Sequence, residues 1–302
     1  MPVNAAAKTK KRLPLGMRNS LIGISFILPN FIGFFIFILI PVCFSFVLSV
    51  MKWDGFNEMT FIGLDNFRAI FGQSAFRNSL ARTLTFTAVT VAITTFAALG
   101  LAVLLNKKIL FKGIFRSSIF FPYIASMVSI AVVWRLMFMR NFGPINEFLR
   151  FMGVSDPPGW IATTQWALPA VMIVYIWKFM GYYMIVYLAA LQDIPVELRE
   201  AASIDGASGF QFFWRVAAPM LKHATFFVVM MLMINSFKSF DLIFAMTEGG
   251  PGQSTTLLSL YIYNRAFIAF DYGQTSAAAL ILFAIIAAAT ILQLRVERKM
   301  SL

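Results

Sequence analysis

The dominant feature of this sequence is a series of long apolar blocks that carry few charges or none. The first block, residues 21–50, contains no Asp, Glu, Lys or Arg, and about 20 apolar residues are enough to cross a bilayer as a helix. Of the 302 residues, 60% are hydrophobic and 13% are charged, against roughly 25% charged in a typical soluble domain. Backbone groups in lipid must be hydrogen-bonded within the segment. The chain is therefore predicted to be an all-α polytopic membrane protein.

Six membrane spans are expected, and they cover residues 21–50, 83–105, 117–139, 166–191, 224–246 and 274–294. Pro29 and Pro41 should kink or interrupt the first span. Residues 1–20 form a basic tail, which is not a cleaved signal because the apolar run after it far exceeds roughly 7–15 residues. The rest, 21–302, is expected to be a single transmembrane domain. The one cysteine, Cys43, excludes a disulfide framework.

The distribution of Lys and Arg predicts the orientation, because basic loops stay on the cytoplasmic side. With the amino terminus inside, 15 of these residues fall on the cytoplasmic side and 7 on the other. Both termini are therefore expected to be cytoplasmic. Topology and attraction to anionic membrane lipid together account for the net charge of +12, and nucleic-acid binding is not needed to explain it.

The segment between the fourth and fifth spans, residues 193–223, carries the signals of two short helices. Asp193 can serve as the N-cap of the first, and Pro195 suits its first turn. Gly206 suits the position just past its end, where a left-handed residue is favoured. A tight turn between two helices is predicted.

The second helix of this segment is expected to begin at a capping box and to carry an aromatic face. Ser208 can cap it while Gln211 reaches back, and the helix should end before Pro219. Aromatic residues recur at i, i+3 and i+4 and share one face: Phe210, Phe213 and Trp214. Such a face predicts docking onto a partner. The alternative is a hairpin lying against the membrane, with Trp214 as interfacial anchor.

At this segment the chain resembles a known family. Glu200-Ala201-Ala202, then Asp205-Gly206-Ala207, then Pro219, are similar to the EAA loop of bacterial ABC importer permeases. Val216 and Ala218 depart mildly from that pattern, where isoleucine and leucine are usual. The resemblance implies that the loop forms coupling helices, which dock into a cleft on a separate ATP-hydrolysing subunit. Carried over by motif position, the docking residues are Glu200, Ala201, Ala202, Asp205 and Gly206.

Two further segments narrow the resemblance. They are residues 61–67, FIGLDNF, and residues 248–252, EGGPG, the latter followed by Thr255-Thr256 and residues 260–263. These segments resemble those of the maltose and glycerol-phosphate type of sugar-uptake permeases, in particular the first of the two permease subunits. The similarity covers nearly the whole chain. It implies alternating access in a bacterial cytoplasmic (inner) membrane, with three kinds of partner: a second permease, two ATPase subunits and an extracytoplasmic sugar-binding protein.

Motifs for catalysis are absent from the sequence. No G-x-x-x-x-G-K-[ST] occurs, so this chain lacks the loop that cradles ATP phosphates. We expect ATP and Mg in the partner subunits and no cofactor in this chain. The single histidine, His223, cannot be built into a catalytic triad or a metal site. The chain is therefore not expected to be an enzyme.

The fourth and fifth spans supply the candidates for a sugar path, because sugars are held by aromatic faces and hydrogen-bonding groups. These candidates are Trp177, Lys178, Tyr182, Tyr183, Asn235, Ser236, Phe237, Lys238, Phe240 and Asp241. Asn235 is the preferred one, since an amide within a membrane helix needs a partner. Lys238 and Asp241, at i and i+3, form either an ion pair, a contact to the second permease or part of the path. Oligosaccharides, monosaccharides and glycerol 3-phosphate all remain open, and the two lysines keep an anionic solute open.

Two other functions are compatible with a membrane protein of this kind. An ion-coupled carrier would use ionisable groups in the spans, for which Arg135, Lys178, Lys238 and Asp241 are available. Six spans without an obvious internal duplication argue against it. A non-transporting scaffold or sensor would retain the permease fold. The carrier predicts solute flux without an ATPase partner, whereas the scaffold predicts ATPase binding without flux.

Overall fold

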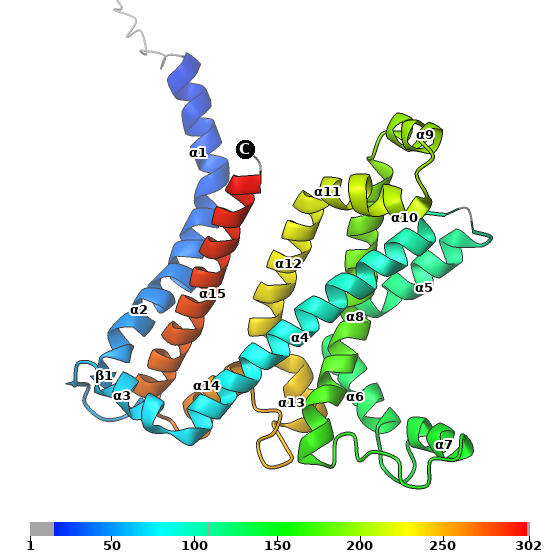
Figure 1. Cartoon of the computed structure of the whole chain (residues 1–302). Coiled ribbons are helices and arrows are strands. Elements are labelled where there is room, and N and C mark those ends of the chain that lie inside the picture. The colour runs from blue at the N-terminus through cyan, green and yellow to red at the C-terminus, as the bar shows by residue number, and fades with distance from the viewer. Residues whose placement is uncertain (1–14, 108, 301–302) are drawn as a thin grey trace, which may run out of the picture.

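The computed structural model describes residues 15–107 and 109–300, and the basic residues at positions 8–12 lie outside this range. The described chain is almost entirely helical, as predicted, with one two-stranded antiparallel hairpin, β1 (Met51–Lys52) and β2 (Thr60–Phe61). Long helices cross the molecule from end to end, and short helices and loops gather at both ends (Figure 1).

The first span is continuous, despite its two prolines. Helix α1 (Leu15–Phe34), the π-helical turn η1 (Phe35–Leu39) and α2 (Ile40–Ser49) follow one another without a break. Pro29 lies inside α1, and Pro41 lies just after η1. The expected interruption is therefore absent. The local distortion is the π turn, which comes directly before the first turn of α2, where the missing N–H of a proline is tolerated.

The second, fourth and sixth spans are single long helices, α4 (Ser74–Leu105), α8 (Thr164–Gln192) and α15 (Tyr272–Met300). Helix α4 begins at Ser74 rather than near residue 83, so the loop before it is shorter than expected. That loop contains the hairpin and the short helix α3 (Asp65–Gly72). Helices α4 and α8 carry much of the main hydrophobic core. A smaller core at one end joins α3, α4, α14 (Leu258–Phe267) and α15.

The third predicted span is broken into two helices. Helices α5 (Lys112–Ile124) and α6 (Met127–Met137) meet at an angle of 102°. Ala125 and Ser126 between them have extended backbone. Pro122 lies in the last turn of α5, where it removes one helical hydrogen bond. An apolar block of the right length therefore does not form one straight helix.

The fifth predicted span is also broken, near its C-terminal end. Helix α12 (Lys222–Phe237) ends before a three-residue break, and α13 (Asp241–Thr247) follows as a separate helix. Within the described residues, four helices are long and apolar enough to cross a membrane alone. Up to six spans result if two bent pairs each count as one, namely α5 with α6, and Gly209–Met220 with α12, which meet at 67°. The expectation of six spans is thus met only as a range of four to six.

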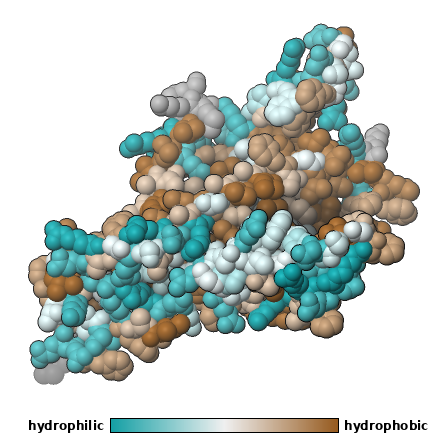
Figure 2. Space-filling view, turned by 60° about the horizontal axis from the view of Figure 1, so that its bottom comes forward, coloured by the Kyte–Doolittle hydropathy of each residue, from teal (hydrophilic) through white to brown (hydrophobic). Residues whose placement is uncertain are grey.

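The two ends of the molecule differ in content. The start of α1 and the end of α15 lie at the same end as α9 (Val196–Ile204), α10 (Gly209–Phe212) and the α4–α5 turn (Figure 1). The opposite end carries α3, α13, α14 and α7 (Pro144–Phe151). Figure 2 shows polar residues gathered over that opposite end, in front of a hydrophobic surface. The start of α1 and the end of α15 thus lie at the end that carries residues 193–221.

Candidate functional site

The predicted coupling segment folds as helix, tight turn and helix. The turn has the geometry of a helix end closed by glycine: Gly206 has φ +76°, its N–H donates to the carbonyl of Ser203 (3.1 Å), and the N–H of Ala207 donates to that of Ala202 (2.9 Å). The predicted left-handed position of Gly206 just past the end of the first helix is thus confirmed. Asp193 does not cap α9; it ends α8 instead, and Pro195 holds the capping position.

The second helix begins at the predicted capping box. The N–H of Ser208 donates to Oε1 of Gln211 (2.8 Å), and the N–H of Gln211 donates to Oγ of Ser208 (3.3 Å). The helix does not stop before Pro219, however. A π-helical turn, η2 (Phe213–Ala217), leads into α11 (Ala218–Met220), and the bend falls at Leu221. Because Pro219 lies in the first turn after the π turn, its missing N–H does not break the helix.

The aromatic residues of this helix divide between two directions. Phe210 is 74% exposed and Trp214 is 56% exposed, with their ring centroids 6.2 Å apart. Phe213 is half-buried and packs against the main core. The three rings therefore do not form one exposed stripe. The outward pair is free to dock a partner, whereas Phe213 fixes the helix to the spans.

Helix α9 presents the carried-over docking residues on its outer side. Glu200, Ala201, Asp205 and Gly206 are exposed, while Ala202 is half-buried. Ile204 is 86% exposed, next to the turn. Ile204 was not among the residues predicted from the sequence, although an isoleucine directly before Asp-Gly in a polar loop is a signal for it.

A cavity of about 340 Å³ lies between this segment and the ends of α4 and α8. Leu191, Ala202, Phe212 and Phe213 are among its lining residues. The guanidinium carbon of Arg199 lies 5.5 Å from the centre of the Phe212 ring, a cation–π contact between the two short helices. The two helices are thus held to each other and to α4 and α8.

Lys178, a candidate for the sugar path, has a different position. Its side chain is buried, and Nζ donates to the carbonyl oxygens of Pro122 (3.1 Å), Tyr123 (3.3 Å) and Ala125 (2.6 Å). These carbonyls lie at the break between α5 and α6, where the helical ladder ends. Lys178 therefore caps the bend.

The aromatic candidates on α8 contact other rings. Tyr182 stacks on Tyr123, with centroids 4.4 Å apart, and Trp177 packs edge-on against Trp134 at 5.3 Å. Tyr183 is buried, and its hydroxyl lies within reach of the Asn235 side chain on α12. The structure thus brings together Tyr183 and Asn235, which is half-buried.

The remaining candidates, near the end of α12, are separated from one another. Ser236 is buried, and its Oγ lies within hydrogen-bond distance of the Met233 carbonyl (2.9 Å) and of Oγ1 of Thr87 (3.1 Å), so it joins α12 to α4. Lys238 and Asp241 are exposed. Among the described residues no ion pair joins these two, because the helix breaks between them; the predicted pairing on one helix is wrong.

Phe237 and Phe240 also stand at this break, Phe237 buried and Phe240 half-buried. The Phe240 ring stacks on Phe244, with centroids 5.3 Å apart, and contacts the Tyr263 ring at 5.0 Å. These rings pack α13 against α14. They form an aromatic cluster between short helices rather than a face on the candidate path.

A further polar feature of the membrane region escaped the sequence argument. Buried threonines recur on one face of α4 at helical spacing: Thr83, Thr87, Thr90 and Thr94. A largely apolar cavity of about 470 Å³ lies beside them, between α4, α8 and α12, and it is lined by Thr87, Tyr187, Thr225 and Met233 among others. Of the four threonines only Thr87 lines this cavity, and the hydroxyls of Thr83 and Thr90 donate to carbonyls of α4 itself.

Other ionisable groups of the membrane region are peripheral. Arg135 pairs with Glu248 at 3.8 Å, and both side chains are more than half exposed. His223 lies 3.7 Å from Glu297 of α15. No group of three or more His, Cys, Asp or Glu that could hold a metal ion occurs within residues 15–107 and 109–300. The arrangement offers neither a catalytic centre nor a relay of charged groups across the bundle.

Comparisons with known proteins agree on one family. Residues 93–302 match the model of the binding-protein-dependent transport system inner membrane component. The trehalose/maltose transport system permease protein MalF of Thermococcus litoralis is 33% identical, over 94% of this chain and 96% of its own. The sn-glycerol-3-phosphate transport system permease protein UgpA of Agrobacterium fabrum is 31% identical, over 93% and 96%. A chain in the crystal structure of a bacterial alginate ABC transporter, in complex with an alginate pentasaccharide-bound periplasmic protein, is similar with a TM-score of 0.83 at 22% identity, over 96% and 98%.

Proposed function

Because the chain belongs to the family of binding-protein-dependent transport system inner membrane components, we propose that it is one of two permeases that together form the path for a carbohydrate in an ABC importer. The family membership confirms the resemblance to ABC importer permeases and agrees with a non-catalytic role. The relatives named for trehalose and maltose and for glycerol 3-phosphate support a carbohydrate or a polyol phosphate as solute.

The partners in this proposal follow from the family. A second permease completes the path, two separate ATPase subunits hold ATP and Mg, and an extracytoplasmic binding protein delivers the solute. The alginate transporter crystallised with a periplasmic protein supports the last of these. In this proposal both termini and α9–α11 lie on the cytoplasmic side of the inner membrane, which the distribution of Lys and Arg supports, with 15 on that side and 7 on the other.

The observation that carries the proposal is the form of the coupling segment. Its exposed apolar side chains, Ile204, Phe210 and Trp214, surround a turn closed by Gly206, and a water-exposed apolar group of this kind marks a protein contact. Its inner side is packed against α4 and α8. ATP-driven closure of the ATPase subunits would move this segment as a rigid body, and the spans would reorient with it.

The solute path is proposed to run past Asn235 and Tyr183. These groups meet between α12 and α8, and a largely apolar cavity of about 470 Å³ lies among α4, α8 and α12. Asn235→Ala should reduce uptake while leaving subunit assembly and basal ATP hydrolysis intact. Ser236→Ala, which removes a helix-joining hydroxyl on the neighbouring position, should instead lower stability without changing the KM for the solute.

Docking is tested by substituting two residues that are nearly equally exposed and lie at opposite ends of the molecule. Ile204→Asp is at the coupling turn, and Phe56→Asp is in the hairpin loop, where Phe56 is 85% exposed. The complete transporter is purified in mild detergent, and ATP-driven uptake of radiolabelled maltose and of glycerol 3-phosphate is measured in liposomes. We expect Ile204→Asp to lose the ATPase subunits and all uptake, and Phe56→Asp to keep the ATPase. Retention of the ATPase by Ile204→Asp would refute the coupling role.

The same experiment separates the alternatives. Solute flux without any ATPase would indicate an ion-coupled carrier, for which the structure gives little support because Lys238 and Asp241 are unpaired with each other and exposed. ATPase retention by the unaltered chain with no flux of any sugar would indicate a scaffold or sensor.

A further inference from the structure

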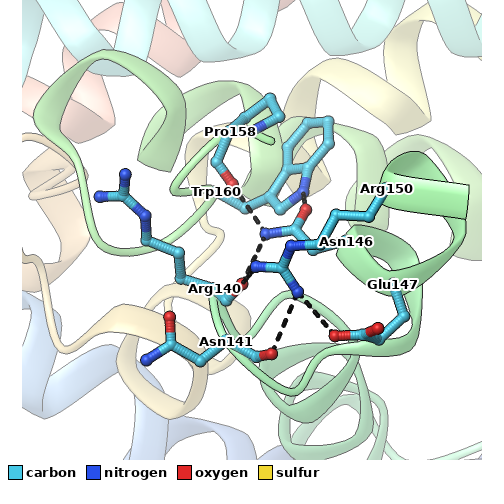
Figure 3. A network of polar contacts seen from close by, with 7 residues as sticks. All are labelled: Arg140, Asn141, Asn146, Glu147, Arg150, Pro158 and Trp160. Carbon is cyan, nitrogen blue, oxygen red and sulfur yellow. Dashed lines mark hydrogen bonds and ion pairs between the residues drawn. The ribbon is translucent and has the colours of Figure 1, made fainter. Parts of the chain in front are cut away.

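The segment between α6 and α8, residues 138–163, is a folded unit around one buried asparagine. Asn146 is 0% exposed, and its carboxamide nitrogen donates to the carbonyls of Arg140 and Pro158, both at 3.1 Å. Its oxygen accepts a hydrogen bond from the indole Nε1–H of Trp160 at 2.8 Å (Figure 3). Every hydrogen-bonding function of this side chain is directed into the loop, so it fixes the start of α7 to the chain that enters α8.

The charges of this segment neutralise one another. Its four ionisable residues form two ion pairs, Arg150 with Glu147 at 2.6 Å and Arg140 with Asp156 at 3.2 Å. The guanidinium of Arg150 also donates to the carbonyls of Arg140 (2.8 Å) and Asn141 (3.2 Å) (Figure 3). The segment therefore carries no net charge, and its charged side chains are paired with one another at the surface.

The outer surface of the same segment is apolar. Phe151 is 88% exposed, and further exposed apolar side chains surround it: Phe142, Phe148 and Met152. Phe148 and Phe151 are spaced i, i+3 on α7, whereas Asn146 and Arg150, spaced i, i+4, face the polar network. Helix α7 is therefore amphipathic, with its aromatic face uncovered.

This aromatic face continues an exposed apolar surface of α6. On α6, which leads into the segment, Val132, Val133 and Leu136 are exposed, and Met139 and Phe142 extend the apolar series towards α7. Helix α7 projects sideways from the bundle at the level where α8 begins (Figure 1). That level is an end of a spanning helix, where the hydrocarbon core meets the headgroups.

We propose that α7 lies in the membrane interface at the end opposite the coupling segment, with Phe148 and Phe151 inserted among the lipid acyl chains. An uncovered aromatic face opposite a polar face that carries charged side chains is typical of helices that lie in the interface plane. A docking site for a soluble protein would instead need a polar rim and would return to water on release. The proposal concerns the lipid contact and stands whatever solute is carried.

The test is depth-dependent fluorescence quenching in the complete transporter. In a Cys43→Ser background, Phe151→Cys is labelled with an environment-sensitive fluorophore, and Glu58→Cys in the exposed hairpin loop serves as the matched position. Both proteins are reconstituted into phosphatidylcholine and phosphatidylglycerol vesicles, with and without nitroxide groups high on the acyl chain.

We expect the label at position 151 to emit at shorter wavelength and to lose most of its fluorescence in nitroxide vesicles, while the label at position 58 is unaffected. A water-like emission at 151 would overturn the proposal. Blue-shifted emission without nitroxide quenching would also overturn it, because the face would then be covered by protein, namely the second permease or the binding protein. Repeating the measurement with and without the binding protein identifies which of these covers it.

Discussion

Replacing Lys178 by methionine should loosen the bend between α5 and α6 without affecting solute recognition. The ammonium group donates to three carbonyls, of Pro122, Tyr123 and Ala125, which have no partner in the interrupted helical ladder. Methionine has a similar length and flexibility but offers no donor. The variant therefore removes the hydrogen bonds while it preserves most of the packing.

The magnitude follows from the three carbonyls. A buried acceptor that loses its partner costs about 1–3 kcal/mol. We take about 1 kcal/mol for each, because the variant also removes the cost of holding a charged group away from water. The sum is about 3 kcal/mol, and since about 1.4 kcal/mol is a tenfold change in an equilibrium, local opening of α5 should become about a hundredfold more frequent.

Amide hydrogen exchange in the reconstituted transporter measures this opening directly. The amides of α5, residues 112–124, should exchange about a hundredfold faster in Lys178→Met than in the unaltered chain. Lys238→Met is the matched control, because Lys238 is exposed at the end of α12 and most surface substitutions change stability by about 0.5 kcal/mol or less. Exchange in the control should be unchanged.

Transport kinetics provide the result that would refute this reasoning. If Lys178 only caps the bend, Lys178→Met lowers the amount of stable transporter and leaves the KM for solute unchanged. If α5 exchanges as in the unaltered chain while the KM rises, then Lys178 contacts the solute and the capping role is wrong.

Three further predictions concern other parts of the chain. A Cβ on Gly181 would lie 2.0 Å from a backbone oxygen of α5, so Gly181→Ala should destabilise the folded chain by about 1–3 kcal/mol. Gly100 has nothing within 4 Å of such a Cβ, so Gly100→Ala should stabilise the chain by up to about 1 kcal/mol. Equal thermal midpoints of the two variants in nanodiscs would contradict the close approach of α5 and α8. Asn146→Ala leaves the Pro158 carbonyl and the Trp160 indole N–H without a partner, while the Arg140 carbonyl keeps its hydrogen bond from Arg150. The variant should weaken residues 138–163 by about 2 kcal/mol, seen as faster proteolysis of this segment alone. Hydrogen bonds from the amides of residues 57 and 56, then from the side chain of residue 57, lower the pKa of Asp54 from 3.8 to about 2. The stabilisation of the hairpin loop by ionised Asp54 is therefore complete above pH 3.8 and is lost as pH falls through about 2. A carboxyl NMR titration of Asp54 with a midpoint near 3.8 would contradict this prediction.

The sequence predicted the spans that are single helices and the local form of the coupling turn. Residues 166–191 correspond to α8 within two residues at the start and one at the end. Gly206 and the Ser208 capping box were predictable because both signals are local: a left-handed backbone position and a side chain three residues from its partner.

The breaks in the third and fifth spans were not predictable from hydropathy. An apolar average over 117–139 does not distinguish one straight helix from two helices at 102°. The bend depends on Lys178, which is 53 residues from Ala125 in the sequence and supplies the donor that the interrupted ladder lacks. The absence of a Lys238–Asp241 ion pair, one of the three alternatives for these residues, has the same origin, since a regular i, i+3 spacing holds only if the helix continues.

Helix α8 connects the elements on which the proposed function depends. Its last turn, with Leu191, lines the cavity beneath the coupling segment. Near its middle, Lys178 holds the α5–α6 bend, Gly181 allows α5 to approach closely, and Tyr183 lies against Asn235 on α12. A displacement of the coupling segment is therefore transmitted by one rigid helix to both the bend and the proposed path, because packed helices move as bodies rather than deforming continuously. It follows that loosening the bend through Lys178 should weaken the solute's stimulation of ATP hydrolysis while the ATPase subunits remain bound, a combination that damage to the coupling turn itself cannot produce.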